Sequence, residues 1–265
     1  MIHARPLPFV LAATDQGAMI VSRFDGHITS ENCGYGVGFQ LLNTGTCDFE
    51  EHNQLIDVLR RRREQFGDGV VAVDCGANIG VATITWARAM GPWGSVLSIE
   101  AQPRLFYALC GNIALGNWFN VTPILGAVSE KSGTMAITEP DYLMPGSLGS
   151  LELRSRESGE RGDVGQRIDY AQPTTHIPTI AIDDLGLTRC DFIKMDVEGM
   201  EAEALRGARE TLRKFRPIVF VERGKCSDSA ILTELRQVGY VFGDFAMGWL
   251  CQHAMEGPVT LRVAA

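Results

Sequence analysis

The chain has 265 residues, 45% hydrophobic and 21% charged, a composition typical of a globular protein large enough to bury its own core. Its formal net charge is −8; an acidic surface repels phosphate backbones and anionic lipid, so nucleic acid and membranes are disfavoured as partners. No apolar run reaches the length of about 18 residues that a membrane span needs, and seven cysteines without a CxxC pair indicate reduced thiols, so we expect a cytoplasmic protein.

Residues 1–69 are expected to form an N-terminal cap or extension. They contain short strand-like pieces and a helical pattern near 50–63, which could cover the sheet or one edge of a pocket. We expect the main domain to occupy residues 70–265.

From residue 70 onward, short apolar runs alternate with helical patterns. In chain order the expected elements are a strand at 70–73, a helix at 79–90, a strand at 95–99, a helix at 103–115, a strand at 121–128, a strand at 192–195, a helix at 200–214, a strand at 217–221, a helix at 229–238 and a strand at 240–247. Strands that alternate with helices predict parallel βαβ units, and therefore an open, doubly wound, mostly parallel α/β sheet.

Residues 138–175 interrupt this alternation. They are polar, contain several glycines, serines and arginines, and show no sustained period. An unstructured stretch of this length inside a domain is typical of a functional lid or a disordered insertion. We interpret it as a variable substrate loop.

Acidic residues stand at the carboxyl ends of four of the five expected strands from 70–73 to 217–221. They are Asp74, Glu100, Asp196 and Glu222. Because open α/β sheets bind ligands at this edge, these are the first candidates for function.

The turn from Asp74 to Gly80 carries the strongest signal. Its glycines allow close approach of a ligand, and the following helix N-terminus favours a carboxylate. Asp74 stands where a dinucleotide fingerprint would have its first glycine, which disfavours a nicotinamide dehydrogenase. The turn suits the methionine end of S-adenosylmethionine, and Glu100 could accept both ribose hydroxyls. The alternatives are a structural turn with an aspartate cap and a solvated strand end.

The same residues resemble the first motif of FkbM-family methyltransferases, Asp74-Cys75-Gly76-Ala77-Asn78-Ile79-Gly80, although Cys75 stands where valine or isoleucine is common. A later run is also similar to the family's signature, Asp191-Phe192-Ile193-Lys194-Met195-Asp196-Val197-Glu198-Gly199-Met200-Glu201. Residues 182–185 and the serine-rich segment 147–151 resemble two further family segments. The resemblance covers about residues 34–239 and implies a class I methyltransferase fold acting mainly on hydroxyl groups of sugars, polyketides and other secondary metabolites.

The resemblance also implies contacts to S-adenosylmethionine. The methionyl part would be held by Asp74, Gly76 and Asn78, the ribose by Glu100, the adenine by Ala127 and Val128 with Ala101 and Gln102 nearby, and the sulfonium and methyl by Asp196. Methyl transfer to oxygen mainly requires positioning of the acceptor in line with the methyl group.

An alcohol acceptor must also lose its proton, which requires a carboxylate or histidine within hydrogen-bond reach. Asp196 is the first candidate base and Glu198 the second; the former could instead orient the cofactor ammonium, and the latter could cap the next helix. His176, beside the substrate loop, is a weaker candidate. Asp196 and Glu222 alone are too few ligands for a metal site, so we predict no obligatory metal.

Three functions remain to be compared. A methyltransferase of a small hydroxylated acceptor is favoured by the two motifs and their spacing. A catalytically silent S-adenosylmethionine-binding module, acting as a partner or regulator, would share the binding motifs. A nucleic-acid methyltransferase is disfavoured because the strand at 192–195 is followed by Asp-Val-Glu-Gly rather than a segment that seats a flipped base. The sequence leaves homo-oligomerisation open.

Overall fold

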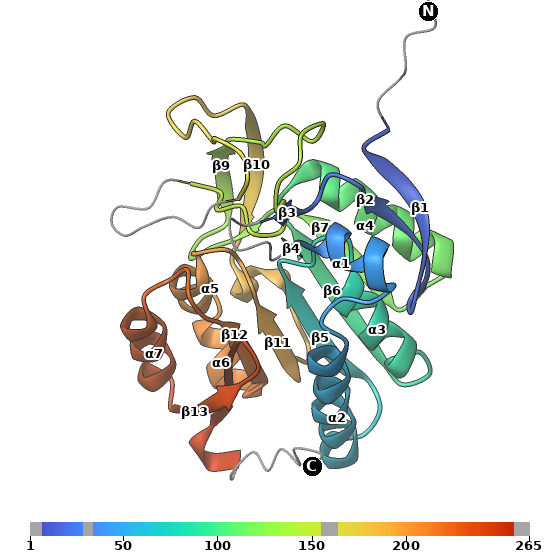
Figure 1. Cartoon of the computed structure of the whole chain (residues 1–265). Coiled ribbons are helices and arrows are strands. Elements are labelled where there is room, and N and C mark those ends of the chain that lie inside the picture. The colour runs from blue at the N-terminus through green and yellow to red at the C-terminus, as the bar shows by residue number, and fades with distance from the viewer. Residues whose placement is uncertain (1–6, 29–33, 155–163, 257–265) are drawn as a thin grey trace, which may run out of the picture.

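The structure, a computed structural model, describes residues 7–28, 34–154 and 164–256. At its centre lies a seven-stranded sheet (Figure 1). Its strands, from one edge to the other, are β13 (Tyr240–Phe245), β14 (Gly248–His253), β12 (Ile218–Glu222), β11 (Phe192–Met195), β5 (Val70–Cys75), β6 (Gly94–Glu100) and β7 (Val121–Leu125). Strands β12 to β7 run parallel, while β14 is antiparallel to both neighbours. The predicted open, mostly parallel α/β sheet is confirmed.

Helices cover both faces of this sheet. They are α1 (Val37–Thr44), α2 (Phe49–Phe66), α3 (Val81–Met90), α4 (Pro103–Gly116), α5 (Glu201–Arg206), α6 (Arg209–Phe215) and α7 (Asp228–Gln237). Successive strand residues point to opposite faces, so Val70 and Ala72 join the buried cluster of α2 and α3, whereas Val73 and Cys75 join that of α5, α6 and α7. Figure 1 shows these two helical groups on opposite sides of the strands.

The single strand predicted at 121–128 is instead two strands in different sheets. A separate sheet consists of β8 (Ala127–Val128), β10 (Thr175–Ile180) and β9 (Gly133–Ile137). The chain crosses between the sheets at Gly126, where a Cβ would lie 2.6 Å from Ile180 Cδ1. Glycine therefore permits the close crossing, and the sequence pattern contained no sign that the pairing partner changes. Strands β9 and β10 were not predicted.

Two other predicted elements are divided. The helix predicted at 200–214 is α5 followed by α6, and at the break a Cβ on Gly207 would lie only 2.1 Å from the carbonyl oxygen of Ser129. The strand predicted at 240–247 ends in a turn at Ala246 with φ 46°, after which β14 returns antiparallel. Neither central residue of this turn, Ala246 or Met247, is a glycine or an asparagine, so β14 was missed.

The described part of the N-terminal extension packs against the α3–α4 side. Its strands are β1 (Phe9–Thr14), β2 (Gly17–Ser22), β3 (His27–Ile28) and β4 (Gly34–Tyr35). The Asn112 side chain of α4 accepts a hydrogen bond from the Ile20 N–H at 2.5 Å and donates to the Ile79 carbonyl at 2.8 Å. One amide thus joins the β1–β2 hairpin to the turn after β5.

The described residues of the predicted substrate loop include three leucines that pack into the fold. Leu148, Leu151 and Leu153 are at most 7% exposed, while residues 155–163 lie outside the described residues. Cys33 also lies outside them, and the six cysteines within them form no disulfide. No helix in the described ranges is long and apolar enough to cross a membrane.

Candidate active site

A pocket of about 380 Å³ lies at the carboxyl ends of β5, β6, β11 and β12. It is lined by every cofactor and catalytic residue predicted from the sequence, namely Asp74, Gly76, Asn78, Glu100, Ala101, Gln102, Ala127, Val128, Asp196 and Glu198. Glu222 lines it as well. His176 lies in β10, opposite Ala136, and is not among the lining residues.

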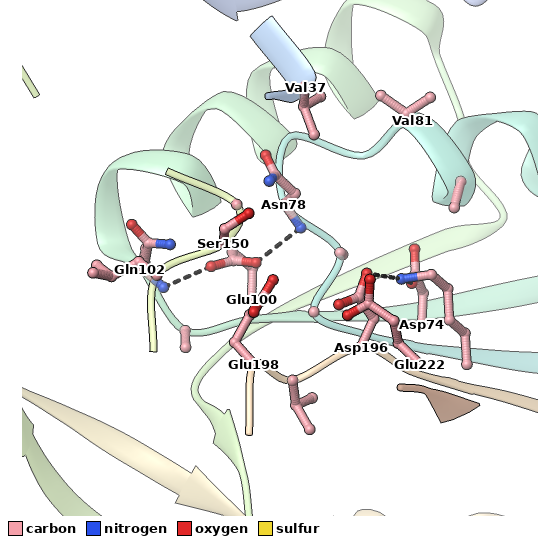
Figure 2. A pocket seen from close by; sticks show the side chains of 18 of the residues that line it. Val37, Asp74, Asn78, Val81, Glu100, Gln102, Ser150, Asp196, Glu198 and Glu222 are labelled. Carbon is pink, nitrogen blue, oxygen red and sulfur yellow. Dashed lines mark hydrogen bonds and ion pairs between the residues drawn. The ribbon is translucent and has the colours of Figure 1, made fainter. Parts of the chain in front are cut away.

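The β5–α3 turn lies directly against the end of β11. Gly76 has φ +82°, and a Cβ at this position would lie 1.8 Å from the backbone oxygen of Asp196. Only glycine fits this approach, because any side chain would meet backbone that cannot swing away. Asn78 follows in the left-handed region, with φ 51°. The turn therefore carries no side chain at Gly76, while the Asn78 side chain extends from it (Figure 2).

Glu100 joins the ends of β5 and β6. Its Oε2 accepts a hydrogen bond from the Asn78 N–H at 2.8 Å and its Oε1 one from the Gln102 N–H at 2.8 Å (Figure 2). Each carboxylate oxygen has a second lone pair, so the group can still accept hydroxyl hydrogens from a ligand. Burial raises the pKa of Glu100 to about 7, although the backbone donors oppose this shift.

Asp74 lies behind the turn rather than in the open part of the pocket. It is fully buried, and its Oδ2 accepts a hydrogen bond from the Thr83 hydroxyl of α3 at 2.5 Å. Its Oδ1 lies 4.0 Å from Lys194 Nζ. Burial raises the pKa of Asp74, while Lys194 and Thr83 favour the charged form. The carboxylate is thus directed at protein partners on both sides.

The strand register places one row of charged side chains on the α2–α3 face of the sheet. Lys194 is paired in register with Asp74 of β5, and Asp196 follows two residues later on the same face. Lys194 Nζ lies 2.7 Å from Asp196 Oδ2. The sequence motif contained this lysine, but sequence reasoning gave it no role.

Asp196 and Glu222 share the end of this row (Figure 2). Burial acts to raise the pKa of Asp196, but Lys194 and a hydrogen bond from Glu222 hold it below the usual value. Burial and the Asp196 charge raise the pKa of Glu222 to about 10. Near neutral pH, therefore, Asp196 carries the charge and Glu222 the proton.

Glu198 occupies the loop between β11 and α5. Its backbone lies in the left-handed region, with φ 53°, an arrangement that a non-glycine residue adopts only when its surroundings enforce it. Its carboxylate contacts Lys225 Nζ, which also donates to the Ser150 carbonyl at 2.9 Å. Burial raises the pKa of Glu198 to about 8, although Lys225 opposes this shift.

Helix α2 contributes two pocket residues that sequence reasoning missed, Glu51 and His52. Burial raises the pKa of Glu51 to about 7 and lowers that of His52 to about 4, so the histidine is neutral near pH 7. They come from the N-terminal extension, far from both motifs in sequence. No local pattern could have connected them to the site.

Three carboxylates gather at the acidic end of the pocket. Oxygen atoms of Asp196, Glu198 and Glu222 lie within 4.8 Å of one another. Lys194 and Lys225 place ammonium groups on two of them, and Glu222 holds a proton. Protein groups therefore compensate part of the charge of the cluster. The sequence-based prediction of no obligatory metal counted only Asp196 and Glu222, and that prediction stays untested.

Comparison with known proteins gives curated relatives that are methyltransferases. The chain is 29% identical to methyltransferase sdnD of Sordaria araneosa over 52% of this chain and 60% of that protein. It is 28% identical to methyltransferase 1 of Beauveria bassiana (strain ARSEF 2860), over 54% of this chain and 59% of that one. The match thus spans about three fifths of each relative's length.

Among solved structures, methyltransferase FkbM from Methylobacillus flagellatus KT resembles the chain with a TM-score of 0.48 and 19% identity, covering 70% of this chain and 43% of that one. The precorrin-6y C5,15-methyltransferase from Geobacter metallireducens GS-15 has a TM-score of 0.44 and 15% identity, with 77% and 87% covered. The methyltransferase FkbM domain, as a family model, matches residues 74–242, from the β5–α3 turn into β13. The chain therefore belongs to the FkbM methyltransferase family.

Proposed function

We propose that the protein transfers a methyl group from S-adenosylmethionine to a hydroxyl group of a small metabolite. The observation that carries this proposal is the convergence of the glycine turn, Glu100 and the acidic cluster at Asp196 on one pocket. Membership of a methyltransferase family supports methyl transfer; the cofactor and the acceptor oxygen are our inference.

The pocket fits the cofactor in its chemistry. Gly76 leaves backbone where a carboxylate can approach the start of α3, and Glu100 retains lone pairs for ribose hydroxyls. Ala127 and Val128 offer apolar contacts for the adenine ring. Bound there, the cofactor supplies an electrophilic methyl group on a positively charged sulfonium. The ionised Asp196 would face that charge.

We place the base at Glu198 rather than at Asp196, the first candidate from the sequence. Asp196 is held ionised by Lys194 and hydrogen-bonded by Glu222, which makes it a weak proton acceptor. The pKa of Glu198, about 8, lies near the operating pH, where a general base works best. Glu198 would accept the proton of the acceptor hydroxyl as its oxygen attacks the methyl group.

The acceptor is proposed to be small and hydroxylated, and not a nucleic acid or a membrane lipid. Glu51 lines the α2 side of the pocket near the ionised Asp196, and the chain has a net charge of −8, so an acceptor rich in phosphate groups is disfavoured. Residues 138–175 are proposed to hold the acceptor, since Ser150 and Leu151 of this segment face the pocket. We place the reaction in the cytoplasm and leave homo-oligomerisation to experiment.

Calorimetric titration of the purified protein with S-adenosylhomocysteine, with NADH as the control ligand, tests the cofactor. Micromolar binding of the first and none of the second is expected. Absence of S-adenosylhomocysteine binding would contradict the proposal.

Radiolabelled S-adenosylmethionine and a panel of hydroxylated acceptors then separate an enzyme from a silent binding module. With an acceptor in hand, Glu198→Gln should lower kcat by about 100-fold, within the usual contribution of a general base, with S-adenosylhomocysteine affinity nearly unchanged. Equal losses in turnover and affinity would instead assign Glu198 to binding, and a protein that binds the cofactor without any turnover would support the silent module.

A further inference from the structure

Segment 146–154 lies along one side of the pocket. Its Leu148 N–H donates to Asp25 Oδ1 at 2.8 Å, and two side chains of the site also reach its backbone. Near β6, Gln102 Nε2 donates a hydrogen bond to the Leu148 carbonyl at 2.8 Å. Near the loop after β12, Lys225 Nζ donates to the Ser150 carbonyl at 2.9 Å. The segment is therefore tied to both halves of the site by side chains that reach its backbone.

Lys225 makes a second contact, to the carboxylate of Glu198. An ammonium group has three donors, so it can serve the Ser150 carbonyl and this carboxylate at once. The Lys225 and Glu198 side chains are 21% and 16% exposed, so this pair is less open to solvent than a typical surface ion pair. One cation thus joins the segment over the pocket to an acidic group inside it.

We propose that Lys225 is a positioning residue that couples the seating of segment 146–154 over the pocket to the orientation of the Glu198 carboxylate. The inference rests on the function proposed above, in which Glu198 accepts the proton of the acceptor. With the segment seated, the Ser150 carbonyl holds the ammonium group against Glu198. When the segment lifts, Lys225 loses this acceptor and Glu198 loses a fixed partner, so the base is aligned only when the pocket is covered.

The charges around Glu198 come from several elements. Lys225 faces it from the loop after β12, Asp196 from the end of β11, Glu222 from β12 and Glu201 from α5. Asp196 and Glu201 disfavour a charge on Glu198, Glu222 is protonated near pH 8, and Lys225 favours the charge. Loss of the Lys225 cation therefore raises the pKa of Glu198, whereas loosening the segment elsewhere leaves that cation in place.

Calorimetry with S-adenosylmethionine and S-adenosylhomocysteine between pH 6 and 9 tests the coupling without an acceptor. The first ligand carries a permanent sulfonium charge and the second does not, so the ratio of their affinities reports the charge of nearby carboxylates. In the wild type the ratio should shift toward S-adenosylmethionine by about threefold or more as Glu198 ionises near pH 8. Lys225→Met should move the midpoint up by about one pH unit, and Lys225→Arg should restore it.

Hydrogen exchange supplies the readout for the segment. S-Adenosylhomocysteine should slow exchange of the 146–153 amides in the wild type and in Lys225→Arg, and less in Lys225→Met. Arg154→Met is the matched control, because it removes the contact of the same segment with Glu203 of α5 without touching a pocket carboxylate. It should leave the pH midpoint unshifted.

An unshifted midpoint in folded Lys225→Met, or an equal shift in Arg154→Met, overturns the coupling and leaves the proposed function standing. Should Lys225→Met fail to fold, Lys225→Gln removes the same charge, keeps a donor and must show the same shift. If the wild type binds neither ligand, the proposed function fails and the coupling fails with it.

Discussion

The two halves of the pocket are formed by different kinds of chemical group. At the ends of β5 and β6, called the β5–β6 half, the shape depends on the close backbone packing at Gly76 and on the Glu100 carboxylate, which accepts hydrogen bonds from two backbone N–H groups. At the ends of β11 and β12, the β11–β12 half, it is a set of charged side chains balanced against Lys194 and Lys225. Ligand binding and stability should therefore be most sensitive to added side-chain atoms in the β5–β6 half, and to the loss of a charge or a change of pH in the β11–β12 half.

The largest expected effect is in the β5–β6 half. Gly76→Ala places a Cβ against the Asp196 carbonyl and should weaken S-adenosylhomocysteine binding by more than about 100-fold, equivalent to about 2.8 kcal/mol. Gly67→Ala is the matched control, since Gly67 has a similar φ of +75° with no atom within 4 Å of a Cβ. Calorimetry and thermal melts compare the affinity and the stability of the two variants. Similar losses of affinity would show that backbone strain, and not the close approach to Asp196, causes the loss.

In the β11–β12 half, Lys194→Met should cost the most stability. The change removes a cation that is 7% exposed and leaves the fully buried carboxylate of Asp74 and the 28% exposed carboxylate of Asp196 without it. Breaking a buried pair such as that of Lys194 and Asp74 lowers the free energy of unfolding by about 3 kcal/mol. Lys225→Met removes a partly exposed partner and should cost less than about 1 kcal/mol. Urea unfolding measures the free energy of unfolding of both variants. Equal losses would contradict the claim that the more buried lysine contributes more to stability.

Asp196→Asn and Glu100→Gln should differ in how they change the affinities for S-adenosylmethionine and S-adenosylhomocysteine. The first removes the charge proposed to face the sulfonium, so S-adenosylmethionine should lose about tenfold in affinity while S-adenosylhomocysteine changes little. The second weakens a contact to the ribose, which both ligands carry, so both should lose about tenfold. Calorimetry with each ligand measures this; the reverse pattern would exchange the roles of the two carboxylates.

The smallest expected effect is on the thermal stability of the ligand-free protein. Burial raises the pKa of Glu51 and Glu100 to about 7 and that of Glu198 to about 8, each from 4.5. The folded state then binds more protons than the unfolded chain up to these values, so the free energy of unfolding falls as pH rises through them. The pKa of His52 is lowered from 6.5 to about 4, so this residue makes the free energy of unfolding rise with pH, but only below pH 6.5.

We therefore expect a Tm lower by about 4 °C at pH 8.5 than at pH 6.5, measured by circular dichroism. A Tm that rises across this window would contradict the assignment of raised pKa values to the buried carboxylates.

The sequence predicted which residues of the β5–β6 half line the pocket because their determinants are local, and their contacts to a cofactor stay a prediction. Gly76 and Asn78 follow a buried strand directly, and Glu100 ends the next one. Their positions depend on strand period and turn chemistry, which are properties of a few consecutive residues. The main parallel strands were predicted for the same reason.

The β11–β12 half was predicted only in part because its contacts are distant in the chain. Lys225 lies 27 residues from Glu198 and 75 from Ser150, and neither spacing has a local pattern. Glu51 and His52 reach the pocket from an extension that carries no motif. Strands β9 and β10 pair with each other across the polar stretch that showed no period, and β10 also pairs with β8, which follows the crossing at Gly126. Neither pairing has a local sequence pattern.

A crystal structure of the chain with S-adenosylhomocysteine would test the central claim, that backbone and Glu100 hold the cofactor while the acidic cluster faces the reacting end. We predict both ribose hydroxyls on Glu100, the amino-acid part against the turn at Gly76, and the sulfur directed toward Asp196 and Glu198. A ligand bound with its ribose away from Glu100, or with its sulfur directed away from the acidic cluster, would contradict the account.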